Sequence, residues 1–376
     1  MTVSSPRVTI VSSVSDLLDC PDVSKSIAAA HRAGVTVSAW LWSRNNCAPR
    51  VPSGVSATVL MSGGGVHNRG LLIMYVRWMS TVFWRVLREQ PGATYVGHRF
   101  ESALPIAIAS LFRRSEYVFY NTDNVSTSYR WPRMIKSVLM AAERLTARRA
   151  ILHVVPGHSR WSHPDANLRI IPNRPSQATI DAAQKLRVQR DYKLSSRLTL
   201  YVNGWLVETR GIGTLIRAIE YCPVGAVQLL VAGKIGCEDA KKLISLPCAE
   251  YLGELTFEES LATYYRAHLA FTFYDPQIEI NRIAEPNKWG DCVVTGTPFI
   301  TNTEVQTARS YLENKQCLAV AYSDHEGLAR LLSNLSSHSE QWRKLKQSIA
   351  QVPVESCDQA WDNVVTTISR RSCPQT

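Results

Sequence analysis

The sequence lacks the features that mark secreted, membrane-spanning and metal-binding proteins. Its nine cysteines form no Cys-x-x-Cys pair and no Cys/His spacing typical of a metal site, so a disulfide framework or a zinc site is not expected. No window holds the roughly eighteen uninterrupted apolar residues of a membrane-spanning helix; the nearest run, 71–87, is broken by Arg77 and Arg85. No basic segment precedes a long apolar run at the start of the chain, which argues against a signal peptide. These absences favour a protein of the cytoplasm.

Acidic residues are also scarce, but only in one half of the chain. Residues 1–175 contain 21 Lys and Arg against 9 Asp and Glu, whereas residues 176–376 contain 21 against 22. The whole excess of +11 therefore lies in the first half. Such an asymmetry predicts an anionic partner for that half, which is a membrane surface, a lipid diphosphate or nucleic acid.

Length and pattern indicate two α/β domains. A chain of 376 residues with 45% hydrophobic content can form two sizeable cores. Strand and helix patterns alternate from residue 8 to 171 and again from 198 to about 320, which predicts parallel sheets with helical crossovers. We expect a first domain over 1–175, a linker with a short helix over 176–196, a second domain over 197–355 and a final helical segment over 356–376.

The most informative segment is 285–300, which reads Glu-Pro-Asn-Lys-Trp-Gly-Asp and continues to Thr-Pro-Phe-Ile. Proline is favoured where a helix begins, and Gly296 and Pro298 end it about two turns later. Lys288 and Asp291 are three apart and share one helix face. A cation and a carboxylate in the first turn suit the phosphates and sugar hydroxyls of a nucleotide diphosphate. The alternative is an ordinary capped helix with an internal ion pair.

A second segment has a related composition. A buried strand over 198–203 ends at Gly204, and the loop that follows carries Arg210 and Gly211 just before a helix over 214–221. A further strand, 227–233, also ends in glycine.

Together these segments resemble the donor-binding region of glycosyltransferase family 4-like enzymes with the GT-B fold, from about 198 to 302. The chain departs from the family pattern in three ways. The Gly-Gly loop that often follows the first strand is absent, since 10–15 reads Ile-Val-Ser-Ser-Val-Ser. Trp205 stands where the family often has arginine, and Ile283 stands eight residues before Asp291, where the family has an acid. Glu279 and Glu285 lie on either side of Ile283, and either could take the role of that acid.

The resemblance implies two Rossmann-like, doubly wound domains that face a central cleft, with the last helix crossing back to the first domain and Trp361 as its anchor. It implies a nucleotide-sugar donor and no metal or other cofactor; the sequence also has no Asp-x-Asp motif. Arg210 and Lys288 would neutralise the departing diphosphate, Asp291 would hold ribose hydroxyls, and Glu279 or Glu285 would contact the sugar. The other donor-binding residues that we expect are Gly204, Gly211 and Asn287.

Polar residues also follow strands in the first half. His98 and Glu101 come after a strand over 94–98, and Asp123 comes after a strand over 117–121. Ligands bind at such strand ends in open α/β sheets, so these residues are candidates for acceptor binding or for a catalytic base. The alternatives are a structural histidine and a turn or cap carboxylate. The family retains anomeric configuration, which we expect here, whereas a base at Asp123 or Glu101 would make the enzyme inverting.

A helix expected over 69–90 indicates what kind of partner the first half binds. It has a broad apolar face with two tryptophans, and Arg69, Arg77, Arg85 and Arg88 fall within about half of its circumference. This pattern suits a helix lying in the plane of a membrane surface, and the alternative is a core helix with a solvated edge. We therefore expect a peripheral enzyme at the cytoplasmic face of the inner membrane, with a lipid-linked or glycan acceptor. The family resemblance implies a role in exopolysaccharide, capsule or lipopolysaccharide synthesis.

Two other functions remain open. A nucleotide-sugar epimerase could use the same fold, but the basic first half would then have no explanation. A non-enzymatic basic binding module predicts a recognisable nucleic-acid motif, and the sequence contains none, so we expect no nucleic-acid partner.

Overall fold

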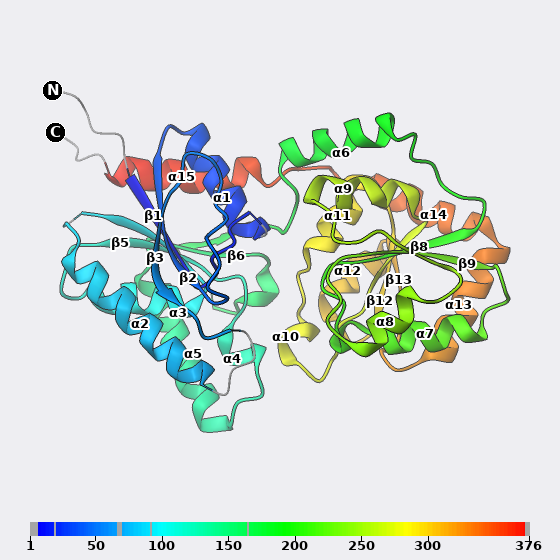
Figure 1. Cartoon of the computed structure of the whole chain (residues 1–376), viewed down its shortest axis with the longest axis horizontal. Coiled ribbons are helices and arrows are strands. Elements are labelled where there is room, and N and C mark those ends of the chain that lie inside the picture. The colour runs from blue at the N-terminus through cyan, green and yellow to red at the C-terminus, as the bar shows by residue number, and fades with distance from the viewer. Residues whose placement is uncertain (1–6, 19, 66–69, 91, 164, 373–376) are drawn as a thin grey trace. The chain divides into compact units, whose positions relative to one another are not determined.

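The computed structural model describes residues 7–372 except 19, 66–69, 91 and 164. The chain forms two compact units (Figure 1). The first contains Met1–Pro172 together with Cys357–Thr376, and the second contains Asn173–Ser356. The C-terminal segment therefore belongs to the same unit as the N-terminal half.

Within the described residues, the first unit has a seven-stranded sheet with the order β3-β2-β1-β4-β5-β6-β7. All neighbouring strands are parallel. The direction of winding reverses between β1 and β4, which makes this the switch point where open α/β sheets bind ligands. The strands are β1 (Arg7–Ser12), β2 (Thr36–Ser43), β3 (Ser56–Ser62), β4 (Thr94–His98), β5 (Glu116–Tyr120), β6 (Leu152–Val155) and β7 (Leu168–Ile170).

Helices cover both faces of this sheet. One face packs against α2, α3 and α5 around Trp78, and the other packs against α1 and α15. The helix expected over 69–90 is α2, and Arg69 lies outside the described residues. The helical segments are α1 (Pro21–Arg32), α2 (Leu71–Arg88), α3 (Phe100–Ala109), α4 (Val125–Ser128), α5 (Arg133–Arg149), the 3₁₀ turn η1 (His158–Arg160) and α15 (Asp358–Ser372).

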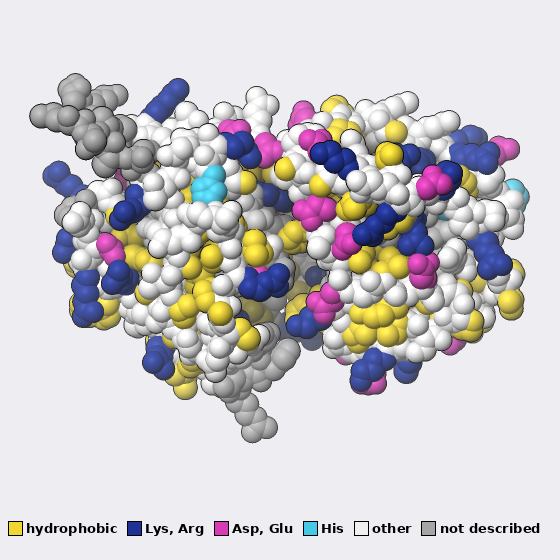
Figure 2. Space-filling model, turned by 45° about the horizontal axis from the view of Figure 1, so that its top comes forward, with side chains coloured by type: hydrophobic (Ala, Val, Ile, Leu, Met, Phe, Trp, Pro, Cys, Tyr) yellow, Lys and Arg dark blue, Asp and Glu magenta, His cyan; other side chains and the backbone are white. Residues whose placement is uncertain are grey.

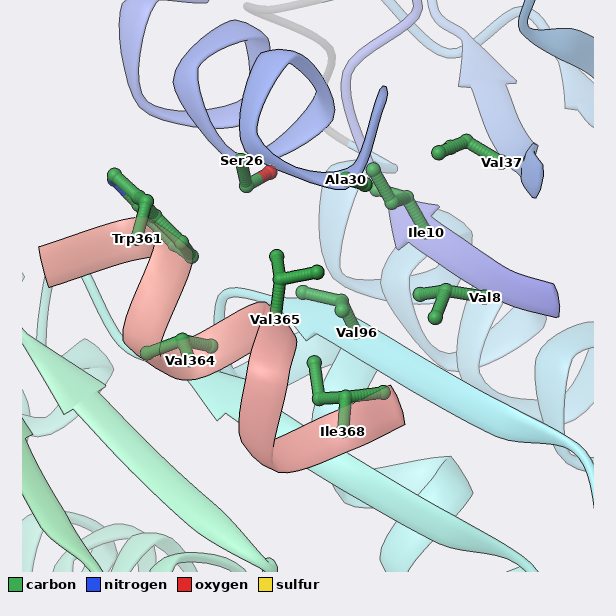
Figure 3. A pocket seen from close by; sticks show the side chains of 10 residues that line it. All are labelled: Val8, Ile10, Ser26, Ala30, Val37, Val96, Trp361, Val364, Val365 and Ile368. Carbon is green, nitrogen blue, oxygen red and sulfur yellow. The ribbon is translucent and has the colours of Figure 1, made fainter. Parts of the chain in front are cut away.

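The last helix is part of the core of the first unit. Trp361 is buried, and its ring meets that of Tyr120 edge-on at 4.9 Å. Val364, Val365 and Ile368 continue the same apolar stripe toward α1 and β1 and leave only a small apolar cavity (Figure 3). Burial of this stripe fixes α15 to the sheet.

The second unit repeats the architecture. In the part of the chain that the structure describes, its sheet has six parallel strands in the order β10-β9-β8-β11-β12-β13, with the switch point between β8 and β11. The strands are β8 (Leu198–Asn203), β9 (Val227–Ala232), β10 (Ala249–Tyr251), β11 (Leu269–Thr272), β12 (Phe299–Asn302) and β13 (Cys317–Val320).

Two helical layers enclose this second sheet, with α7, α8 and α13 on one face and α6, α9 and α11 on the other. Ile180 and Ala183 of α6 are buried in this unit, so the helix inside the expected linker is part of a core. The helical segments are α6 (Gln177–Gln189), η2 (Glu208–Arg210), α7 (Ile212–Tyr221), α8 (Glu238–Ile244), α9 (Phe257–Thr263), η3 (Tyr264–Arg266), α10 (Glu279–Arg282), α11 (Asn287–Thr295), η4 (Gln306–Ala308), α12 (Arg309–Glu313), α13 (His325–Ser337) and α14 (Ser339–Ala350).

The described residues contain no helix that is both long enough and apolar enough to cross a membrane. The eight cysteines of the described part are unpaired, and five of them are buried as small core side chains.

Candidate active site

Three glycines line the carboxyl edge of the second sheet, and Gly204 lies at its switch point. Gly204, Gly233 and Gly253 follow β8, β9 and β10, with φ angles of 92°, 118° and 77°. A side chain on Gly233 would collide with the backbone of Gly204, so the turns after β8 and β9 are packed backbone to backbone. Only glycine adopts these conformations without strain, and the result is an edge with few side chains between the backbone and a ligand.

The helix α11 is fixed at this edge by packing on both sides. Pro286 precedes it in an extended conformation, and Gly296 ends it with φ of 65°. Gly290 lies directly on the backbone of Asn173, which leaves no room for a Cβ. The indole of Trp289 is buried and donates a hydrogen bond to Thr272 Oγ1 at 3.1 Å. The start of α11 is therefore held in place relative to β11.

Lys288, in the first turn of α11, lies over Gly204. A Cβ added to Gly204 would stand 3.4 Å from Lys288 Cε and 3.7 Å from Nζ. The side chain is half-buried. Desolvation lowers the pKa of Lys288 to about 7, and the nearby charge of Arg210 adds to this effect. Cys292 and Asp291 raise this pKa by smaller amounts, so burial and the charge of Arg210 outweigh the negative charge near Lys288.

Arg210 reaches the same place from the turn η2. Gly211 follows it in a left-handed conformation with φ of 67°, and Phe273 leaves no space for a side chain there. The guanidinium carbon of Arg210 lies 4.6 Å from the centre of the Tyr274 ring, a cation–π contact. The loop is held by Tyr322, whose hydroxyl accepts from the Gly211 N–H at 3.2 Å and donates to the Glu208 carbonyl at 3.0 Å.

Asp291 lies one turn beyond Lys288, beside a buried polar cluster. Burial raises the pKa of Tyr264, and the charge of Asp291 raises it further. The Tyr264 hydroxyl contacts the side chain of Asn203, which also donates to Ser260 Oγ at 3.2 Å. Asp291 is thus placed near polar groups at the end of β8, on the same short helix as Lys288.

The other residues predicted to bind the donor lie near Lys288 and Arg210 but make no described contact with them. Glu279 begins α10 and is exposed, and Asn287 is the first residue of α11. Burial raises the pKa of Tyr311, and the carboxylate of Glu285 adds to this shift, so that carboxylate lies near the Tyr311 ring. Neither glutamate is among the charges that shift the pKa of Lys288. The structure therefore brings Gly204, Arg210, Gly211 and Lys288 together, and leaves the choice between Glu279 and Glu285 open.

In the first unit, the corresponding edge carries His98. This buried histidine contacts Ser12 Oγ through Nδ1 at 3.1 Å, which joins β4 to β1 across the switch point. Its Nε2 is buried without a hydrogen-bond partner. Burial lowers the pKa of His98 well below its usual value, and the charge of Arg99 lowers it further. The ring is therefore neutral at physiological pH.

The two carboxylates predicted beside His98 have different surroundings. Glu101, at the start of α3, accepts a hydrogen bond from Ser13 Oγ at 2.5 Å. Asp123 is exposed and lies 3.6 Å from Nη1 of the buried Arg160. Glu101 lies in the first turn of the helix after β4, and Asp123 lies in the loop after β5, so both follow strands of the first sheet.

Several polar groups at this edge were not predicted from the sequence. Arg99 has φ of 66° and ψ of 166°, a strained conformation for any residue with a side chain. Arg99 Nε, Asn121 Oδ1 and Thr122 Oγ1 are all buried without hydrogen-bond partners. Each of these residues stands within two positions of the end of β4 or β5, and that position was the signal available in the sequence.

In the residues that the structure describes, no group of three or more His, Cys, Asp and Glu side chains could hold a metal ion.

Comparison with known proteins identifies the fold. No protein-family model matches the sequence, and no curated protein sequence is significantly similar to it. Among solved structures, sucrose-phosphate synthase from Thermosynechococcus elongatus matches with a TM-score of 0.66 and 14% identity over 97% of this chain and 98% of that one.

Two further structures match over similar lengths. One is described as a UDP-N-acetylglucosamine 2-epimerase from Listeria monocytogenes, with a TM-score of 0.63, 10% identity and coverage of 97% of this chain and 96% of that one. Another is HepE from Anabaena in complex with UDP and glucose, with a TM-score of 0.61, 14% identity and coverage of 96% and 97%. These matches confirm the predicted α/β fold of GT-B type with two Rossmann-like units. Membership of glycosyltransferase family 4 stays a prediction.

Proposed function

We propose that the chain is a glycosyltransferase that moves a sugar from a nucleotide-diphosphate sugar to an acceptor. One observation carries this proposal: Lys288 stands over Gly204 with the charge of Arg210 close to it, and the opposing charge of Asp291 has the smaller effect. Two neighbouring cations that repel each other are stabilised by a ligand with two or more negative charges. A diphosphate at the start of α11 and beside the switch point satisfies this requirement.

In this proposal the donor is held by its diphosphate. Lys288 and Arg210 bind the phosphate oxygens, and the N–H groups at the start of α11, including that of Asn287, add donors. When the bond from the sugar to the diphosphate breaks, negative charge grows on the leaving oxygen, and the two cations stabilise it. Asp291 accepts hydrogen bonds from ribose hydroxyls, and Glu279 or Glu285 contacts the transferred sugar.

The acceptor is proposed to bind the edge of the first sheet. His98 Nε2, Asn121 Oδ1 and Thr122 Oγ1 are buried polar atoms without protein partners, and a hydroxyl-rich molecule supplies both donors and acceptors to such groups. His98 is neutral and can accept a hydrogen bond from an acceptor hydroxyl. We propose retention of configuration, in which no protein base removes that proton. A base at Glu101 or Asp123 would instead give inversion.

The substrate class follows from the resemblance and from the basic first half. We propose a lipid-linked or glycan acceptor in the synthesis of exopolysaccharide, capsule or lipopolysaccharide. UDP is a reasonable first donor base to test, because HepE was crystallised with UDP and glucose and a Staphylococcus aureus protein, MnaA, with UDP.

A nucleotide-sugar epimerase is the second candidate. The observation that favours it is that the Listeria structure, whose description names a 2-epimerase, matches about as well as the synthases do. The products separate the two functions. An epimerase converts the donor to its stereoisomer without an acceptor, whereas a transferase releases the nucleoside diphosphate and passes the sugar to an acceptor or, slowly, to water.

The test measures release of nucleoside diphosphate from UDP-glucose, UDP-N-acetylglucosamine, GDP-mannose and dTDP-glucose, with the sugar product followed by NMR. We expect release from one donor, reduced roughly a hundredfold or more in Arg210→Gln and unchanged in Arg217→Gln, an exposed arginine on α7. Formation of a stereoisomeric nucleotide sugar would identify an epimerase. A folded protein that acts on none of the four donors would count against the proposal for these donors.

A further inference from the structure

The outer surface of α2, α3 and α5 in the first unit is apolar where a solvated helix surface would be polar. These helices bury one side against the sheet through Trp78, Val82 and Ala147. On the opposite side of α2, Leu72, Ile73, Val76 and Trp84 are 68%, 73%, 53% and 56% exposed. The helix therefore has a second apolar face, which the core does not use.

Helix α5 has the same property with a regular spacing. Met134, Val138 and Leu145 are exposed, at 83%, 68% and 56%, and Ala141 between them is exposed too. The steps of four, three and four residues place these side chains in one stripe. The stripe lies opposite Glu143 and Ala147, which face the interior.

Aromatic residues continue this surface from α2 to the end of α3. Phe83 meets Trp84 at 5.3 Å and Phe112 at 6.4 Å between ring centres. Phe112 and Leu111 are 71% and 56% exposed. α3 contacts both α2 and α5, so the apolar residues of the three helices belong to one layer. We call this surface the α2–α5 face.

Positive charges outnumber negative ones around this face, although Arg85 pairs with Glu89 at 2.9 Å and Arg148 with Asp165 at 3.5 Å. Helix α2 carries three arginines and no acidic residue. The acidic residue of α5, Glu143, is buried and accepts a hydrogen bond from Ser126 at 2.5 Å. Figure 2 shows hydrophobic and basic side chains side by side on the surface of the first unit. The exposed basic residues on α2, α5 and the end of α3 are Arg77, Arg85, Arg88, Arg114, Arg133, Arg148 and Arg149.

We propose that the α2–α5 face binds the surface of a bilayer that contains anionic lipids. Exposed apolar and aromatic side chains enter the boundary between headgroups and acyl chains, while the arginines contact lipid phosphates. The choice of a lipid surface as the partner rests on the combination of exposed apolar stripes with exposed arginines. Nucleic acid would use the arginines but would leave the apolar stripes in water. A second copy of the chain, packed face to face, would bring an excess of arginines against arginines, because only Arg85 and Arg148 among them have a carboxylate partner.

This inference is independent of the nucleotide-sugar site, since it rests on residues of the first unit alone. It also extends the sequence prediction, which considered only the helix over 69–90. The apolar stripe on α5 and the aromatic cluster at the end of α3 add two further contacts on the same layer.

The test is sedimentation of the full chain with vesicles of phosphatidylcholine alone or with 30% phosphatidylglycerol. We expect binding to the anionic vesicles, and weaker binding as salt increases. The triple variant Ile73→Ser/Val76→Ser/Val138→Ser is expected to bind at least tenfold more weakly. A matched control, Val188→Ser/Val224→Ser/Val354→Ser, changes three valines of the second unit that are 79%, 107% and 55% exposed, and it should bind like the wild type.

Charge is tested by a second pair of variants. Arg77→Gln/Arg88→Gln should weaken binding to anionic vesicles by roughly tenfold or more, whereas Arg217→Gln/Lys344→Gln, on the second unit, should not. No binding by the wild type to anionic vesicles, or equal binding by the serine variant and its control, would overturn the proposal. A dimer in sedimentation velocity that only the first triple variant loses would show that a second copy covers the face instead. Nucleoside-diphosphate binding, measured on the same variants, should be unchanged.

Discussion

Lys288 stands over the backbone of Gly204, with its Nζ 3.7 Å from the point that a β-carbon on that glycine would occupy. The two residues are 84 positions apart, on α11 and at the end of β8. Because Gly204 has no side chain, the cation of Lys288 borders an open space at the edge of the second sheet. The predictions below follow from that space.

Gly204→Ala should weaken binding of a nucleoside diphosphate. The new methyl group would stand against Lys288, and φ of 92° would strain the backbone. Gly225→Ala is the matched control, because Gly225 has φ of 80° and no atom near its β-carbon position. We expect both variants to lose roughly 1–2 kcal/mol of stability in urea, and only Gly204→Ala to lose at least tenfold in affinity by calorimetry. If the two variants bind the nucleoside diphosphate equally well, Gly204 is not part of the binding site.

Diphosphate affinity should depend on pH in a defined direction. The pKa of Lys288 is lowered to about 7 in the free protein, and a bound diphosphate favours the protonated form and raises that pKa. Below pH 7 the lysine is already charged, so this group leaves the affinity constant. Above pH 7 the affinity should fall by up to tenfold per pH unit, with proton uptake on binding that calorimetry in buffers of different ionisation enthalpy can measure. In Lys288→Met this dependence should vanish.

Removing the lysine charge should stabilise the fold. Because the pKa of Lys288 falls from 10.5 to about 7 on folding, the unfolded chain binds more protons between these pH values, and the contribution of this group to stability rises with pH across that window. Lys288→Met should therefore raise the free energy of unfolding at pH 7 by roughly 1 kcal/mol, a modest value because the side chain is only half-buried. Lys344→Met, at an exposed position, should have little effect. Destabilisation by Lys288→Met would contradict the shift.

Tyr322 should act as a positioning residue for the Arg210 loop. Tyr322→Phe removes the hydroxyl that joins the Gly211 N–H to the Glu208 carbonyl. We expect a stability loss of about 1 kcal/mol and a several-fold loss of diphosphate affinity, since Arg210 is then held less firmly. Tyr221→Phe is the control, because its ring is 64% exposed on the outer end of α7. If Tyr322→Phe binds the diphosphate with full affinity, the Tyr322 hydroxyl does not position the Arg210 loop.

The fold could be predicted because most strands and helices have a recognisable local sequence pattern. Alternating apolar strands and amphipathic helices, with glycine and proline at their ends, gave both parallel sheets and the helix from Pro286 to Gly296. The role of α6 was harder to predict. Its polar composition indicated a linker, but Ile180 and Ala183 are enough to bury one side of it. Burial of so narrow a stripe depends on the neighbouring α9, which local sequence does not reveal.

The proximity of Arg210 and Lys288 could be predicted, because each stands in a short segment with a glycine and the start of a helix. Their role in donor binding stays a prediction. Arg99, Asn121 and Thr122 could not, because their buried and unpaired polar atoms result from the packing of separate strands. The position of Glu285 near Tyr311 likewise depends on how the loop before α11 folds.

The most direct test of the central claim is calorimetric titration of the wild type, Lys288→Ala and Asp291→Asn with UDP, GDP, ADP, dTDP and CMP. The account predicts that one nucleoside diphosphate binds the wild type, that affinity falls at least tenfold in each variant, and that the monophosphate CMP binds weakly or not at all. It would be contradicted if the folded wild type bound none of the diphosphates, or if one bound equally well when Lys288 is replaced.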